Sequence, residues 1–437
     1  MTEDPNIVEA ILGALKFTNA TPERLLTLSD SEWEELLLYA DLSHVTFALA
    51  MQCPGFLPDW VRTRINRNLS DNRARVDLIR SEYLEIETAF ASSGVEYVVL
   101  KGFAQCPEYS PRLETRFQSD IDLFCPVTSQ TGAVKALEQL GYYALPTPET
   151  ADHLPVMVRR SGWRWRGNMY DPQMPPSIEL HHRLWNINQM RFGPKRLESF
   201  WFRRTTQRAE GLSFPGLNSV DNLGFSALQV LRDLLGFILL AHKVYELAYF
   251  LHRNSTNKMF WSEWRTTHDD DLRMCQAISF CLAKACFGCE LAPEATQEID
   301  RLPASVVNWV ATYGPMSLKT YRTLNKNAVW LHIALVNSLH DRLAVLMRMF
   351  PKPPEVRKVM ANTGHCPSDV PTWKQRARYL IYCLYRAPQH AFLILLTLMS
   401  GLRIIMLKMP FFRRATKRPD ESVRRAEVAE LSQGPGR

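Results

Sequence analysis

The 437-residue chain lacks the short motifs that mark several large enzyme classes. It contains no Walker P-loop, no G-x-S-x-G segment and no H-E-x-x-H segment, so none of these three chemistries is indicated. It also lacks internal repeats and low-complexity segments. A composition of 46% hydrophobic and 22% charged residues excludes a disordered or collagen-like chain. A net charge of +7 is small for this length and does not by itself predict nucleic-acid binding.

The cysteine pattern lacks the pairing expected of a metal site or a disulfide framework. Nine cysteines are scattered in mostly apolar contexts, which predicts reduced, buried thiols of a cytoplasmic protein. The CxxC at residues 286–289 has no second CxxC to complete a zinc site, so we interpret it as helix-end packing and leave metal or redox chemistry as the alternative. The first residues lack a basic stretch followed by an apolar one, so no export signal is predicted.

A run of 18 or more uninterrupted apolar residues is also lacking. The closest approach is residues 391–407, which Gly401 and Arg403 interrupt, so we expect a buried or interfacial helix rather than a spanning one. Residues 401–437 hold nine Lys/Arg and four Asp/Glu, which predicts a solvated basic tail. Peripheral contact of residues 391–414 with an anionic membrane remains the alternative, and we do not expect nucleic acid as a partner.

The pattern of apolar residues predicts an α+β protein whose strands are concentrated between two helical regions. Residues 6–93 are expected to be mostly helical, with a capping box formed by Ser31 and Glu34. The later helices are expected at 225–251, 272–293, 304–313, 326–350 and 372–407. Strands are expected at 95–100, 121–125, 142–145, 156–158 and 178–180, with a helix between 127 and 141. We therefore predict four regions: 1–93 helical, 94–185 α+β, 186–360 helical, and 361–437 helical with the basic tail.

Acidic side chains with strand spacing form the main candidate for chemistry. Asp120 and Asp122 are two residues apart at the start of a predicted strand, so their carboxylates lie on one face while Ile121 points into the core. Two neighbouring carboxylates repel each other unless a cation lies between them. Glu179 and His181 share a face of another predicted strand. If the two strands are neighbours, three carboxylates form a site for Mg²⁺ or Mn²⁺ suited to phosphoryl chemistry.

Positive and small residues precede the aspartates. Lys101-Gly102 ends a predicted strand, and glycine there would let backbone N–H groups approach a phosphate. Lys101 and Arg116 supply positive charge for a polyphosphate, while Ser119 could bind a phosphate oxygen or orient a carboxylate. A D-x-D pair alone is weak evidence, but a strand with KG, then R-x-x-S-D-I-D, then a strand with E-x-H is much more specific.

These segments resemble the nucleotidyltransferase superfamily with the DNA polymerase β fold, and most closely a group of uncharacterised bacterial nucleotidyltransferase family proteins. The resemblance is sharp at residues 99–123 and 178–181 and weaker over most of 30–390. It implies a small mixed-sheet domain flanked by larger helical segments. It also implies that Asp120, Asp122 and Glu179 hold Mg²⁺ while an NTP such as ATP donates its nucleotidyl group to an acceptor hydroxyl. Where the superfamily usually has Gly-Gly or Gly-Ser, this chain has Gly102-Phe103, a departure that bears on phosphate binding.

The resemblance does not supply the acceptor, which is a small molecule, a saccharide or a protein. Lys101, Gly102, Arg116, Ser119 and His181 are the predicted nucleotide-binding residues. Substituting either aspartate by alanine is expected to abolish Mg²⁺-dependent NTP turnover without changing the fold. The alternative is a degenerate, non-catalytic protein that binds nucleotides or acts as a scaffold.

Two further patterns are read as structural. Lys243, on an apolar helix, is expected to extend its charge into solvent rather than reach a triphosphate. The alternation of Trp and Arg at 163–166 is compatible equally with a strand that packs its tryptophans and with a base-stacking surface.

Overall fold

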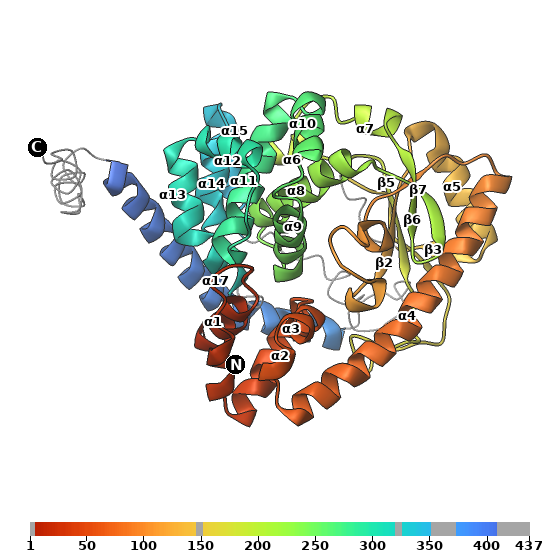
Figure 1. Cartoon of the computed structure of the whole chain (residues 1–437), viewed down its shortest axis with the longest axis horizontal. Helices are drawn as coiled ribbons and strands as arrows, with labels where there is room; N and C mark the ends of the chain where they lie inside the picture. Colours follow the sequence, from red (N-terminus) through yellow and green to blue (C-terminus); the bar gives the residue numbers. More distant parts are fainter. Residues whose placement is uncertain (1–4, 146–151, 320–325, 351–372, 409–437) are drawn as a thin grey trace, which may run out of the picture. The chain divides into compact units, whose positions relative to one another are not determined.

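The structure, a computed structural model, describes residues 5–145, 152–319, 326–350 and 373–408 (Figure 1). Over these residues the fold is α+β, with a seven-stranded mixed sheet and many helices, as the sequence predicted. The chain divides into two compact units, residues 1–382 and 383–437, and the division falls inside the last helix. The four predicted regions, with boundaries at 93/94, 185/186 and 360/361, stay predictions.

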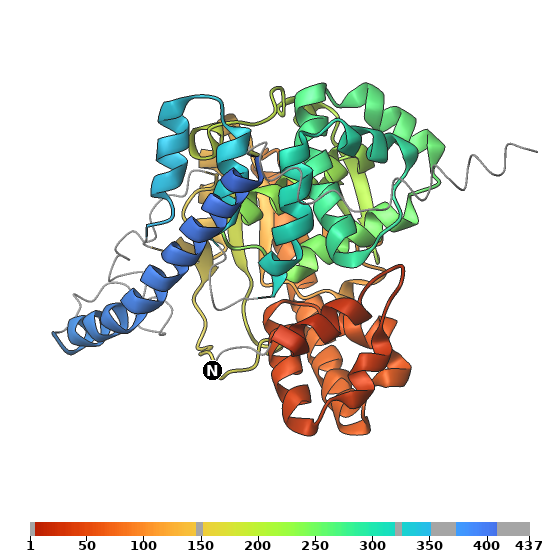
Figure 2. The same ribbon diagram turned by 90° about the vertical axis from the view of Figure 1, so that its left-hand side faces the viewer.

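The chain before the sheet is helical, as expected. Its helices are drawn in red and orange in Figure 2: α1 (Pro5–Ala14), α2 (Asp30–Leu42), α3 (Thr46–Gln52) and the long α4 (Asp59–Ser92). The predicted capping box at Ser31 and Glu34 is wrong by two residues. Ser29 is the N-cap of α2, and its side chain and backbone exchange hydrogen bonds with Glu32. Both pairs have the same i, i+3 spacing, so the local pattern did not distinguish them.

Seven strands form one sheet in the order β3-β4-β5-β2-β1-β7-β6. Their bounds are β1 Val98–Val99, β2 Asp120–Phe124, β3 Tyr142–Ala144, β4 Met157–Arg159, β5 Ser177–His181, β6 Thr205–Ala209 and β7 Leu212–Gly216. β2 pairs in parallel with β5 and antiparallel with β1, while β1 pairs in parallel with β7. The pairing of β2 with β5 brings together the strands that carry the predicted site residues Asp120, Asp122 and Glu179, although the two strands are more than 50 residues apart in the chain.

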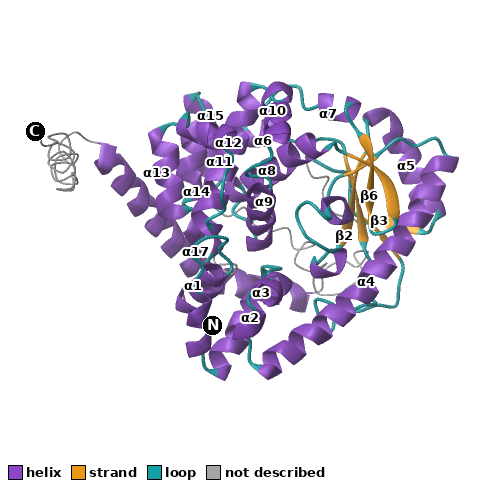
Figure 3. Ribbon diagram, viewed as in Figure 1, coloured by secondary structure: helices purple, strands orange, loops and turns teal. Residues whose placement is uncertain are grey.

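One face of the sheet is covered by α4 and by α5 (Val127–Gln139), as Figures 1 and 3 show. The apolar side chains of that face belong to one buried cluster. It includes Ile121, Leu123, Ile178 and Leu180 from β2 and β5, together with α4 residues such as Tyr83. Because side chains alternate along a strand, the intervening residues of β2 and β5 lie on the opposite face.

Most of the helices that follow β5 in the chain gather on the other side of the sheet in Figure 1, whereas the short α7 (Ser199–Phe202) lies at one end of the sheet. The others up to residue 350 are α6 Ile187–Met190, α8 Ser219–Leu235, α9 Ala241–Arg253, α10 Lys258–Thr267, α11 Asp270–Phe287, α12 Pro293–Asp300, α13 Ala304–Tyr313, α14 Ala328–Leu335 and α15 Leu339–Met347. The helix expected at 304–313 is confirmed. Two expected single helices, 225–251 and 326–350, are each two helices. Phe237, after α8, has a positive φ of 62°, which a continuing helix does not allow.

The strand predictions were right in place but incomplete in number. The strand expected at 95–100 is reduced to two paired residues, and β6 and β7 were missed. They form a hairpin around Glu210-Gly211, both of positive φ, and only β7 alternates clearly between buried and exposed positions. The interpretation of residues 163–166 as a strand was wrong, because this segment lies in a loop.

The predicted late helix is α17 (Trp373–Lys408), within which Pro388 lies. Among the described residues, no helix is both long enough and apolar enough to traverse a bilayer. The predicted membrane-contact segment 391–414 is described only as far as residue 408, and most of the predicted basic tail lies outside the described residues.

Candidate active site

The face of β2 and β5 opposite the apolar core carries four polar side chains. The strands pair in register, so Asp122 on β2 stands beside Glu179 on β5. Asp120 lies two residues before Asp122, and His181 two residues after Glu179. These four side chains therefore lie on the face of the sheet opposite Ile121 and Ile178. The sequence analysis required β2 and β5 to be neighbours for a three-carboxylate site, and they are neighbours.

Asp122 is the most firmly held of the carboxylates. Its side chain is buried, and its Oδ1 accepts hydrogen bonds from Lys101 Nζ at 2.7 Å and from His181 Nε2 at 2.7 Å. Burial acts to raise the pKa of Asp122, but the Lys101 charge and the His181 hydrogen bond outweigh it and hold that pKa well below its usual value. Asp122 is therefore ionised at neutral pH.

Asp120, unlike Asp122, has no hydrogen bond and no ion pair on its carboxylate within the described chain. Burial, followed by the negative charge of Asp122, raises the pKa of Asp120 well above its usual value. A carboxylate left without a partner beside a second one is an arrangement that a bound cation would relieve.

Glu179 completes the acidic group and faces two histidines. Its Oε2 lies 3.4 Å from His181 Nε2 and 3.9 Å from Nε2 of His153, a residue that the sequence analysis did not single out. Burial raises and the His181 hydrogen bond lowers the pKa of Glu179, with a net lowering. Burial lowers the pKa of His181, but its bonds to Asp122 and Glu179 raise it more. The His181 ring therefore links the two carboxylates, Asp122 and Glu179.

Three of these side chains are placed to share a metal ion. One ligand atom from each of Asp122, Glu179 and His181 lies within 4.8 Å of the other two, and this group does not include Asp120. Carboxylate oxygens suit Mg²⁺ and Mn²⁺, while an imidazole nitrogen suits transition-metal ions. The donor set therefore fits a divalent cation bound mainly by oxygen.

Lys101 and Gly102 follow β1 closely. Gly102 has a φ of +65°, which favours glycine, and a Cβ there would lie 2.2 Å from Nε2 of Gln118, so the Gln118 amide would have to move. Phe103, the departure from the superfamily pattern, is buried between Tyr83 and Phe214. The segment that follows Lys101 is only a four-residue 3-10 helix, Gly102–Gln105. A phosphate role for Gly102 stays a prediction.

Among the described contacts, neither Arg116 nor Ser119 forms a hydrogen bond or an ion pair with the carboxylates of Asp120, Asp122 or Glu179. The guanidinium of Arg116 pairs with Glu246 of α9, with Nε 2.8 Å from Oε1, and bonds Gln105 Oε1 at 2.8 Å. Its charge still contributes to lowering the pKa of Asp120. Ser119 is exposed, and its backbone carbonyl accepts the N–H of Ser177. Both therefore stay predicted, rather than observed, nucleotide contacts.

Helix α8 brings one cation, Arg232, that the sequence did not indicate. Arg232 lies 3.5 Å from Asp152 and 3.1 Å from Asp233, and it is close enough to Asp122 that this carboxylate raises its pKa. Lys243 pairs with the buried Asp233, so its interpretation as a solvated surface lysine was wrong. No local pattern marks Arg232, because its closeness to Asp122 is decided by helix packing.

Arg75 of α4 holds the segment that leads into β2. Its buried guanidinium donates to the backbone carbonyls of Gln118, Asp171 and Met174. Single lysines and arginines on a long helix resemble surface charges in sequence, so this role was not predictable either.

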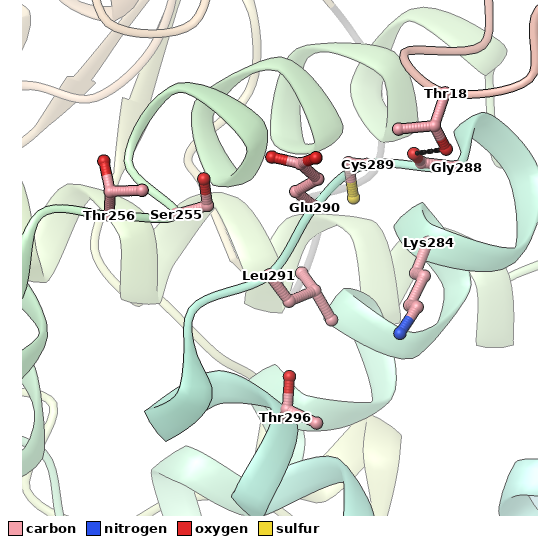
Figure 4. Close-up of a pocket in the computed structure, with 9 residues that line it drawn as sticks. All are labelled: Thr18, Ser255, Thr256, Lys284, Gly288, Cys289, Glu290, Leu291 and Thr296. Carbon is pink, nitrogen blue, oxygen red and sulfur yellow. Dashed lines mark hydrogen bonds between the residues drawn. The ribbon is translucent and has the colours of Figure 1, made fainter.

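The CxxC lies apart from this group. Cys286 and Cys289 are free and buried at the end of α11, and burial raises the pKa of both thiols, as expected for helix-end packing. Cys289 lines a hollow of about 510 Å³ together with residues such as Lys284 and Glu290 (Figure 4).

Residues 29–288 match the family model described as uncharacterised nucleotidyltransferase. The chain belongs to this family. The matched range includes the whole sheet and every predicted site residue. No curated protein and no solved structure matches the chain. The family places the chain among the transferases at a coarse level, and the buried Asp122–Glu179–His181 group fits that assignment.

Proposed function

We propose that this family member is a divalent-metal-dependent nucleotidyltransferase that transfers NMP from an NTP to an acceptor hydroxyl. The observation that carries the proposal is the in-register pairing of β2 with β5, which puts Asp120, Asp122 and Glu179 on one face of the sheet. Mg²⁺ is the expected ion, with Mn²⁺ as the alternative. Asp120 and Asp122 hold it together with Glu179.

The chain's own residues would divide the reaction between them. The acceptor oxygen forms a bond to the α-phosphorus of the NTP as the bond from that phosphorus to the pyrophosphate oxygen breaks. Glu179, whose lowered pKa keeps it ionised, accepts the hydroxyl proton. A bound divalent cation supplies electrostatic stabilisation of the triphosphate.

Positive charge for the phosphates comes from beside the carboxylates. Lys101 is already 2.7 Å from Asp122, and Arg232 adds a second cation from α8. The exposed hydroxyl of Ser119 is available for a phosphate oxygen, whereas Arg116 would have to leave Glu246 to reach one. His181 orients Asp122 and Glu179 through its bonds to both.

Calorimetric titration of NTP in the presence of Mg²⁺ or Mn²⁺, combined with a pyrophosphate-release assay, tests the proposal. Glu179→Gln should weaken metal-dependent NTP binding, because Glu179 helps to hold the ion, and should lower turnover by about a hundredfold or more through loss of the general base. Asp77→Asn, an exposed carboxylate on α4, is the matched control and should behave as wild type.

Two outcomes would contradict this function. The first is turnover retained in Asp120→Asn or Asp122→Asn, which would contradict the assignment of these residues as metal ligands. The second is tight NTP binding with no turnover on saccharide, small-molecule and protein acceptors, which would favour the non-catalytic nucleotide-binding alternative.

A further inference from the structure

The helix α17 carries an exposed apolar stripe. Phe392, Leu395, Leu396 and Met399 follow the i, i+3, i+4, i+7 spacing of one helix face, and their side chains are between 45% and 60% exposed. Large apolar residues scattered singly on a surface are ordinary, but four of them at the spacing of one helix face indicate an interaction surface.

Two residues on the side of the helix opposite the stripe are buried. Thr397 is buried, and its hydroxyl bonds the carbonyl of Leu393 within the helix, while Gly401 is also buried.

The charge of this part of the sequence has one sign. Residues 370–419 contain ten Lys/Arg and no Asp or Glu. Cations that adjoin an apolar helix face are attracted to anionic lipid headgroups, each contributing on the order of 1 kcal/mol near such a surface. Charge complementarity thus favours an anionic partner.

The same charge argues against a second copy of this chain as the partner. Two copies facing each other through this stripe would bring two wholly cationic segments together, and like charges across an interface are unfavourable. Insertion across the bilayer does not fit either, since none of the described helices is long and apolar enough for it.

We propose that α17 docks on the surface of a bilayer that contains anionic lipids, with its apolar stripe in the interfacial layer and its cations among the headgroup phosphates. This inference is independent of the proposed activity, because no residue of the carboxylate group takes part in it.

Co-sedimentation of the full chain with phosphatidylcholine vesicles, with and without phosphatidylglycerol, tests the proposal. Wild type should bind the phosphatidylglycerol vesicles and lose affinity as salt rises. The double variant Leu395→Glu/Met399→Glu should bind about a hundredfold more weakly, since each buried apolar side chain is worth about tenfold or more. Glutamate keeps helix propensity.

The control is an equally exposed apolar pair on another helix. Leu339 and Leu343 of α15 are 73% and 55% exposed and also lie i, i+4, so Leu339→Glu/Leu343→Glu repeats the change away from the cationic segment. It should bind vesicles as wild type does. If the α17 glutamate variant loses its native circular dichroism, the uncharged Leu395→Gln/Met399→Gln replaces it, with the same direction expected.

Three results would overturn the inference. The first is wild type that fails to bind phosphatidylglycerol vesicles at low salt. The second is equal loss of binding in the α15 control. The third is a dimer, seen by light scattering, that only the α17 variant dissociates, which would assign the stripe to a second copy.

Discussion

Asp120 and Asp122 are two residues apart on one strand, yet removing their charges should change stability in opposite directions. Asp122 accepts hydrogen bonds from Lys101 and His181 through one buried oxygen. Asp122→Asn leaves the Lys101 cation without its counter-charge and His181 Nε2 without its carboxylate partner. Breaking a buried ion pair on one side costs about 3–5 kcal/mol, and the retained amide oxygen puts the expected loss near the lower figure.

Asp120→Asn should instead stabilise the metal-free protein. Its carboxylate has no hydrogen bond or ion pair among the described residues, and it faces the negative charge of Asp122. Two residues of strand rise separate such side chains by roughly 7 Å, which at an effective dielectric constant of about 20 gives a repulsion of about 2 kcal/mol. The nearby Lys101 charge offsets part of this, so we expect a gain of about 1 kcal/mol.

Urea unfolding followed by circular dichroism, with EDTA present, measures both changes. The unfolding midpoint should fall in Asp122→Asn and rise or stay level in Asp120→Asn, with Asp77→Asn unchanged. Adding Mn²⁺ should raise the midpoint of wild type but of neither site variant. Equal destabilisation by the two substitutions would refute the reasoning, because it would mean that Asp120 has a structural partner of its own. The sequence alone predicts no effect on folding for either residue, and the ion pairs around Asp122 are the reason to expect otherwise.

Three further predictions concern other parts of the structure. Ser29→Ala should lower the free energy of unfolding by about 1 kcal/mol through loss of the capping box, whereas Ser31→Ala should change it by less than about 0.5 kcal/mol in the same urea titration. Gly102→Ala should destabilise by more than about 1 kcal/mol because its φ is positive and the new Cβ meets Gln118; an unchanged melting temperature would contradict this. Burial lowers the pKa of His332 to about 4, so between pH 6.5 and 4 the unfolded chain binds a proton that the folded chain does not. Stability should therefore fall as the pH drops through that window, by up to about 3 kcal/mol, and His332→Gln should show a shallower pH dependence, while an identical slope would exclude this histidine as its source.

Local sequence patterns predicted many of the helices and strands. Period-two alternation placed Asp120 and Asp122 on the face opposite Ile121, and three- and four-residue spacing found most of the helices. The misses occurred where the local signal is ambiguous. Ser29 and Ser31 offer the same capping spacing, and β6 shows hardly any alternation in burial.

What the sequence by itself determined is the set of chemical groups and the face on which each one lies, because these follow from residue type and from the repeat of a strand or helix. Only the tertiary structure decided that β5 lies beside β2 in register, that Lys101 and His181 meet on one oxygen of Asp122, and that His153 and Arg232 come close to the carboxylates. Strand order and helix packing join residues that are distant in the chain, and the energy that selects them comes from burying whole faces rather than from any local motif.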